Sequence, residues 1–104
     1  MLSELPKFYE EFKKKYPKVW TAYDQLGAAA HGSGPLDAKT RALVKLGMAA
    51  GARLEGSVHS HARLALEAGA KPDEIRQVAL LAVTTLGFPT MMATLSWVED
   101  VLGK

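Results

Sequence analysis

The chain has 104 residues, of which 48% are hydrophobic, with 13 basic and 11 acidic side chains and no cysteine. This length predicts a single domain, residues 1–104, with a modest hydrophobic core. A formal charge of +2 is too small to indicate nucleic-acid binding, and without cysteine the chain offers no disulfide, no thiolate nucleophile and no cysteine metal ligand.

The sequence contains no candidate for a membrane span, because no stretch of about 18 apolar residues is free of charge. The N-terminus mixes acidic and basic residues without the apolar run of a signal peptide. We therefore expect a cytoplasmic protein with no membrane or nucleic-acid partner.

The first half of the chain predicts three helices. Apolar residues recur at spacings of three and four from Leu5 to Tyr16, and Pro17 ends this helix and begins a second over 17–30. The loop His31-Gly-Ser-Gly-Pro35 follows, and Asp37 is a good N-cap for a third helix that ends near Gly51. The inward face predicted for the second helix consists of Val19, Trp20, Tyr23, Leu26 and Ala30.

The second half predicts three more helices. The fourth covers about 54–68 and ends at Gly69, while Lys71-Pro72-Asp73-Glu74 begins a fifth that continues to Leu86. Gly87-Phe-Pro89 is a break, and a sixth helix follows to about Leu102. The inward face predicted for the fifth helix consists of Ile75, Val78, Leu81, Ala82 and Leu86, and that of the sixth of Met92, Leu95, Val98 and Leu102.

Six helices, short loops and no recognisable strand predict an all-α bundle. The fifth helix is apolar nearly all round from Val78 to Thr85, and the sixth carries Met91, Met92 and Trp97 on more than one face. A small monomer has too little core to bury all of these side chains. We therefore predict a homo-oligomer whose interface uses the fifth and sixth helices, the alternative being two central core helices.

Two histidines on the fourth helix are candidates for chemistry. Residues two apart on a helix point roughly 200° from each other, so His59 and His61 cannot hold one metal ion together. No intrachain metal site is predicted, and contact of either histidine with a metal across a subunit interface is left open. His59 shares a four-residue spacing with Glu55 and Arg63, which predicts a solvated charged face.

His61 lies on the apolar side of the fourth helix, one turn after Ser57. An imidazole titrates near neutral pH, so His61 is a candidate for catalytic proton transfer with Ser57 beside it, the alternative being a buried structural histidine. Arg41 and Arg63 are candidates for binding the carboxylate of a small ligand. No third group that would complete a hydrolase triad is visible.

Three segments in order resemble the carboxymuconolactone decarboxylase family, which includes the alkylhydroperoxidase D-like proteins. They are Leu36-Asp-Ala-Lys-Thr-Arg-Ala-Leu43, then His61-Ala-Arg-Leu-Ala-Leu-Glu-Ala-Gly69 followed by Pro72-Asp-Glu-Ile75, then Gly87-Phe-Pro89. The resemblance covers about residues 36–101. It implies an alkylhydroperoxidase D-like helical bundle that assembles as a trimer or hexamer.

The resemblance also implies what this chain lacks. The peroxidase branch of the family has a Cys-x-x-Cys pair where this chain has Leu54 and Ser57, and a glutamate near Ala42. Cysteine-dependent peroxidase activity is therefore not expected. The decarboxylase branch shares His61-x-Arg63, Thr40-Arg41 and Gly87-x-Pro89.

Three functions remain open at this point. The first is a decarboxylase or lyase that uses His61 on a small carboxylic acid. The second is a non-catalytic binding or scaffold protein, and the third a residual redox or metal protein. No cofactor is predicted.

Overall fold

The computed structural model describes residues 4–103, and these residues form helices and loops without a strand. The all-α prediction is confirmed. The described residues divide into two compact units between Pro35 and Leu36. The helices are α1 (Glu4–Lys15), α2 (Pro17–His31), α3 (Ala38–Gly51), α4 (Glu55–Glu67), α5 (Pro72–Leu81), the short 3₁₀ helix η1 (Ala82–Thr84) and α6 (Phe88–Leu102).

The N-terminal unit is a pair of helices, α1 and α2, and Pro17 occupies the first turn of α2 as predicted. The Trp20 indole donates a hydrogen bond of 3.0 Å to the Tyr9 hydroxyl, and the Lys13 ammonium lies 4.7 Å from the Trp20 ring centre. The predicted inward face of α2 is wrong, because α2 has no buried residue. Val19, Tyr23 and Leu26 are between 57% and 67% exposed.

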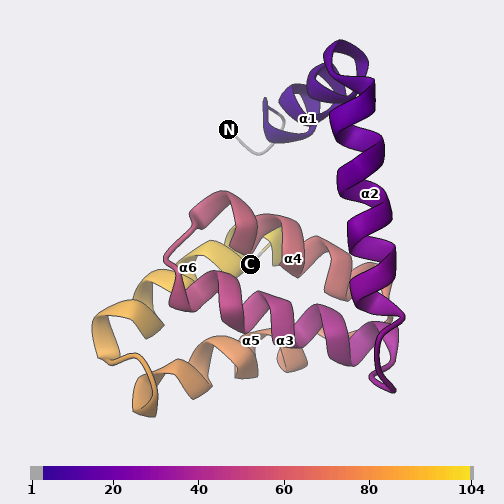
Figure 1. Ribbon diagram of the computed structural model, residues 1–104. Coiled ribbons are helices and arrows are strands. Elements are labelled where there is room, and N and C mark those ends of the chain that lie inside the picture. Colours follow the sequence, from indigo (N-terminus) through magenta and orange to yellow (C-terminus); the bar gives the residue numbers. More distant parts are fainter. Residues whose placement is uncertain (1–3, 104) are drawn as a thin grey trace. The chain divides into compact units, whose positions relative to one another are not determined.

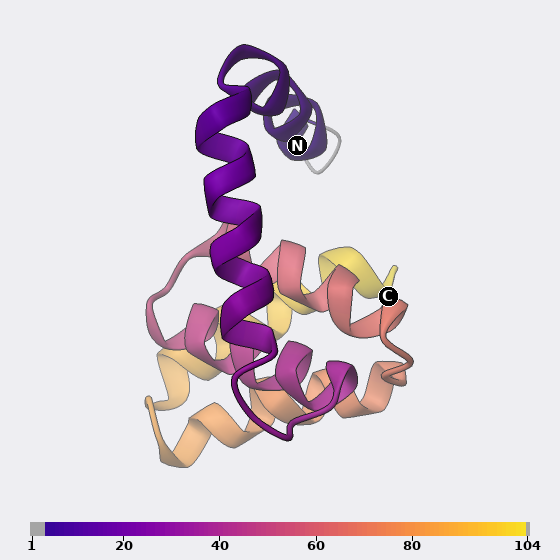
Figure 2. The same ribbon diagram turned by 45° about the vertical axis from the view of Figure 1, so that its right-hand side comes forward.

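The C-terminal unit is built from α3, α4, α5 and α6 (Figures 1 and 2). Helix α3 packs against α4 and α5, and α6 packs against the same two helices, so the four form a ring of neighbours. Each helix contributes one fully buried aliphatic side chain larger than alanine to the core. These four residues are Leu46, Val58, Ile75 and Val98.

Small residues allow these helices to approach closely. The rest of the core is mainly alanine, and a short side chain lets two helix backbones come together without an intervening layer of large side chains. On α3 the buried residues include Leu46 and Ala50, which lie four residues apart and so share one face of the helix. The alanines of the core cluster are Ala42, Ala49, Ala50, Ala62, Ala65, Ala70 and Ala79.

The starts of α3 and α5 and the end of α4 follow the signals read from the sequence. The Asp37 carboxylate accepts a 2.8 Å hydrogen bond from the Thr40 backbone N–H at the start of α3, as predicted. At the start of α5 the Glu74 carboxylate accepts a 2.8 Å hydrogen bond from the Lys71 backbone N–H. Gly69 follows α4 with a φ of 98°, a conformation that favours glycine.

The fifth helix is shorter than predicted. Helix α5 ends at Leu81, and the chain tightens into η1 before Thr85. The backbone N–H groups of Thr85, Leu86 and Gly87 all point to the carbonyl of Ala82. This turn leaves Leu81 and Val83 exposed, so the apolar stretch from Val78 to Thr85 is not buried on all sides within one chain.

The buried face of α6 also differs from the prediction. Met91, Thr94 and Val98 are buried, whereas Met92 is exposed. A threonine can occupy the core here because its hydroxyl donates a 2.8 Å hydrogen bond to the Thr90 carbonyl one turn earlier. None of the helices within residues 4–103 combines the length and apolar character that a membrane crossing requires.

Candidate functional site

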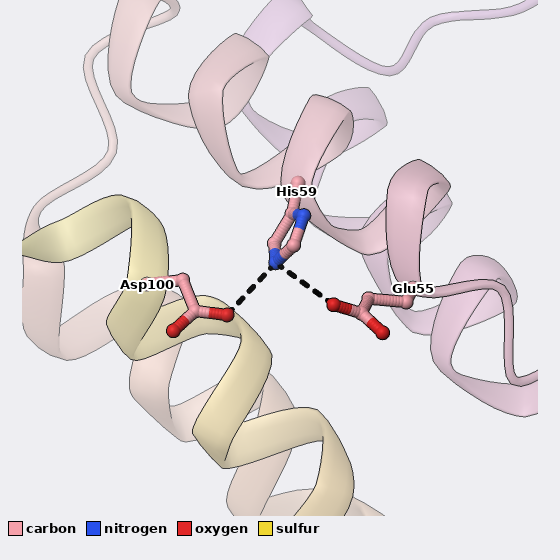
Figure 3. Close-up of side chains that lie close together, drawn as sticks. All are labelled: Glu55, His59 and Asp100. Atoms are coloured by element: carbon pink, nitrogen blue, oxygen red, sulfur yellow. Dashed lines mark hydrogen bonds and ion pairs between the residues drawn. The ribbon is translucent and has the colours of Figure 1, made fainter. Parts of the chain in front are cut away.

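Glu55, His59 and Asp100 lie together where α4 packs against α6 (Figure 3). Nε2 of His59 is 3.0 Å from Oδ2 of Asp100 and 3.9 Å from Oε2 of Glu55. Glu55 and His59 are one turn apart on α4, so their side chains share a face, and α6 supplies Asp100. This cluster places two carboxylates around one imidazole nitrogen.

The three side chains differ in burial. The His59 side chain is 2% exposed, whereas those of Glu55 and Asp100 are 45% and 38% exposed. The prediction that His59 belongs to a solvated face is therefore wrong. The physical reason is that α6 packs over this stretch of α4, which the spacing along α4 cannot reveal.

The second ring nitrogen of His59 is also buried. Nδ1 has no hydrogen-bond partner among the described residues. The neutral tautomer that fits this environment carries its proton on Nε2, which donates it to Asp100. Nδ1 then has no proton to donate, so the absence of an acceptor beside it leaves no N–H group unpaired.

Ser57 and His61, the predicted catalytic pair, are both partly buried on α4. They are separated by one helical turn, as the spacing predicts. Their neighbours Val58, Ala62 and Ala65 are fully buried, so this side of α4 faces the core of the C-terminal unit.

Arg41 and Arg63, the predicted carboxylate-binding residues, lie on different helices. Nη1 of Arg41 donates a 2.6 Å hydrogen bond to the carbonyl of Leu36, which ties the start of α3 to the preceding loop. Arg63 is partly buried on α4, two residues after His61 and therefore on another face of the helix. Arg41 thus has a structural contact, and the substrate-binding roles of Arg41 and Arg63 stay predictions.

A groove of about 460 Å³ lies between α3 and the α5–η1 segment. Its walls are apolar apart from the hydroxyls of Thr40 and Thr85, and none of the lining side chains is titratable. None of the predicted site residues belongs to this lining. The lining residues are Thr40, Leu43, Val44, Gly47, Ala50, Val78, Leu81, Ala82, Thr85 and Leu86.

Three clear pKa shifts belong to contacts at helix ends and between helices. The Thr40 backbone N–H, then its hydroxyl, lowers the pKa of Asp37, and the Lys39 ammonium, followed by the Lys71 N–H, lowers that of Glu74. Hydrogen bonds to Glu99 and then to Asp73 raise the pKa of Arg76. These groups stabilise the helical framework.

The arginine in this framework joins α5 to α6. Nε of Arg76 lies 2.7 Å from Oε2 of Glu99, and Nη2 lies 3.1 Å from Oε1. Both carboxylate oxygens are therefore bound by one guanidinium, a geometry that fixes the two helices more firmly than a single ion pair.

The sequence reasoning missed the cluster around His59. The four-residue spacing of Glu55 and His59 is a signal for two side chains that can act together, and it was read as a charged surface. Asp100 carries no such signal, because it lies 41 residues after His59 and only the packing of α6 on α4 brings it there.

Three comparisons place the chain among known proteins. The sequence profile of the carboxymuconolactone decarboxylase family matches residues 15–100. An uncharacterized protein of Haemophilus influenzae is 45% identical over 60 residues, which are 58% of this chain and 53% of that protein. The chain thus matches about half the length of this curated relative.

The fold also has a solved counterpart. The crystal structure of apo-lpg0406, a carboxymuconolactone decarboxylase family protein from Legionella pneumophila, superposes with a TM-score of 0.82 at 24% identity. The match covers 97% of this chain and 90% of the other.

Proposed function

Because the chain belongs to the carboxymuconolactone decarboxylase family and has no cysteine, we propose that it is a cysteine-independent member that binds a small, largely apolar molecule as a homo-oligomer. The ligand occupies the groove between α3 and the α5–η1 segment. Because the 104 residues of the chain include no cysteine, they cannot supply the thiolate of a cysteine-dependent peroxidase.

One observation carries this proposal, the character of the groove. Its volume of about 460 Å³ falls within the range of roughly 300–1,000 Å³ that is usual for small-molecule sites. The two threonine hydroxyls can orient a ligand, while the remaining walls contact it through apolar atoms. A lining without a titratable group favours binding over acid–base chemistry at this place.

A fluorescent apolar anion, 1-anilinonaphthalene-8-sulfonate, tests the groove. Gly47→Leu extends a side chain into the groove, and its Cβ is tolerated because it meets only Val78 Cγ1 at 3.9 Å. We expect this variant to bind the dye about tenfold more weakly. Gly47→Ala is the matched control and keeps the affinity, so equal binding by the leucine variant would refute the proposal.

Apolar side chains on the outside of α5, η1 and α6 support self-association through these helices. Leu80, Val83, Phe88 and Met92 are exposed in the single chain and do not line the groove. Burying such residues against a second copy removes apolar surface from water, which stabilises an oligomer. The family suggests a trimer or hexamer.

Sedimentation velocity on charged variants tests this interface. Leu80→Glu on α5 introduces a charge into it and is expected to give monomers. Leu64→Glu on α4 is the control, since Leu64 has a similar exposure, 45% against 48%. If Leu80→Glu leaves the oligomer intact, the proposed interface is contradicted. If the groove binds the dye only in the monomeric Leu80→Glu variant, a second copy of the chain fills the groove in the oligomer.

Catalysis by His61 is the second candidate function. The half-buried position of His61 one turn after Ser57 favours it, because partial burial protects a proton donor while leaving it accessible. In this reading Arg41 or Arg63 holds the carboxylate of a small acid and His61 protonates the carbanion left after decarboxylation. Release of carbon dioxide from carboxymuconolactone should then be lost in His61→Gln with the oligomer intact, and turnover that survives this substitution would exclude it.

A further inference from the structure

Glu55, His59 and Asp100 direct three potential metal ligands toward one point between α4 and α6 (Figure 3). One ligand atom from each residue lies within 4.8 Å of the other two. We propose that these side chains bind one divalent transition-metal ion, a site separate from the groove and from His61. Zn²⁺, Co²⁺ and Mn²⁺ are the ions that fit it.

The distances are close to those that a metal site needs. A zinc ion about 2.0–2.2 Å from nitrogen and oxygen ligands in tetrahedral geometry separates those ligands by roughly 3.4 Å. The separations from His59 Nε2 are 3.0 Å to Asp100 and 3.9 Å to Glu55. Relative to His59 Nε2, each carboxylate oxygen therefore has to move by only a few tenths of an ångström, and both carboxylate side chains are exposed enough to adjust.

The donor set favours this class of ion. One imidazole nitrogen and two carboxylates suit zinc, cobalt or manganese, whereas calcium and magnesium favour sites made of oxygen alone. The two carboxylates balance the charge of a divalent ion. Because they are partly exposed while His59 is buried, the ion can enter from the solvent side and keep water in its remaining coordination positions.

The alternative is a purely structural contact in which His59 donates to Asp100. Metal binding at Nε2 would replace this hydrogen bond and move the ring proton to Nδ1. Nδ1 is buried without an acceptor among the described residues, although a metal-bound histidine usually donates its second N–H to one. Metal binding therefore has to compensate for a buried Nδ1–H without an acceptor. We expect the affinity for Zn²⁺ to be lower than that of a zinc site with a complete set of supporting hydrogen bonds.

Titration of the full chain, without a histidine tag and after chelator treatment, tests the site. Isothermal titration with ZnCl₂ should give one ion per chain, and Co²⁺ should give the visible absorption of a low-symmetry site. Glu55→Gln and Asp100→Asn should each lower the Zn²⁺ affinity by about tenfold or more. Both keep the side-chain shape, and Glu55→Gln alters an exposed position, so at least one variant is expected to fold.

Two matched variants serve as controls. Glu67→Gln changes an exposed glutamate at the end of the same helix, and His31→Gln changes a histidine in the N-terminal unit. Neither should change the Zn²⁺ affinity. The proposal is overturned if the chain shows no saturable binding, or if binding persists in both Glu55→Gln and Asp100→Asn variants that retain the helical circular dichroism of the parent chain.

Discussion

Gly87 adopts a backbone conformation that glycine alone reaches easily. Its φ of 100° and ψ of 160° precede the first turn of α6, in a region that costs other residues about 1–3 kcal/mol. We expect Gly87→Ala to lower the free energy of unfolding by about this amount in urea denaturation. The penalty comes from the backbone, because the added Cβ would contact only Pro89 Cδ, at 3.9 Å.

Gly34→Ala is the control for this prediction. Gly34 also lies in a loop, and an added Cβ there meets nothing within 4 Å, with no positive φ to strain it. We expect an effect within about 0.5 kcal/mol. Similar losses in both variants would show that the conformation of Gly87 is not what limits its replacement.

Single residues also mark where the sequence stops being informative. Asp37 was predicted as an N-cap because capping depends on residues within one turn, and the structure confirms it. The environment of His59 was predicted wrongly because its burial depends on α6, whose Asp100 lies 41 residues later in the chain. Local rules thus predict caps and breaks, whereas the environment of a helix face requires the tertiary arrangement.

At the scale of elements, the carboxylates at the starts of α3 and α5 make the stability of the fold decrease at acidic pH. The pKa values of Asp37 and Glu74 are lowered in the folded chain. Such groups stabilise the fold above their ordinary pKa, and this contribution disappears as pH falls through the lower folded value. We therefore expect the free energy of unfolding to decrease as pH drops below about 4.

Asp37→Asn isolates the contribution of α3. Asparagine caps a helix about as well as aspartate but does not titrate in this range. Denaturation at several pH values should therefore show a smaller decrease between about pH 5 and pH 3 in this variant than in the parent chain. An identical pH dependence in the two proteins would mean that the cap of α3 does not contribute to acid sensitivity.

The element boundaries show a related limit. The start of α5 at Pro72 was predicted, since proline and two acidic residues favour a first turn. Its end was predicted five residues too late, because the apolar stretch from Val78 to Leu86 contains no glycine or proline that would mark one. At the change to η1 three backbone N–H groups share the carbonyl of Ala82, and the Thr85 hydroxyl donates a 3.0 Å hydrogen bond to the carbonyl of Leu81.

At the scale of the whole molecule, the helical class followed from periodicity, and the resemblance gave the family that the profile match supports. The faces of α2, α5 and α6 were less predictable. Periodicity identifies an apolar side of a helix, but a single chain need not cover it, as the exposed Val19, Tyr23 and Leu80 show. Of these residues, Leu80 lies on α5, one of the two helices to which the predicted oligomer interface was assigned.

The distribution of buried residues predicts which part of the chain forms a cooperative folding unit. The core cluster runs from Ala42 to Val98, and α2 contributes no buried residue. We therefore expect a fragment of residues 36–104 to unfold cooperatively in urea on its own. Leu46→Ala removes a fully buried side chain and should destabilise full chain and fragment alike by about 2–5 kcal/mol. A fragment without a cooperative transition would show that α1 and α2 are required for the core to form.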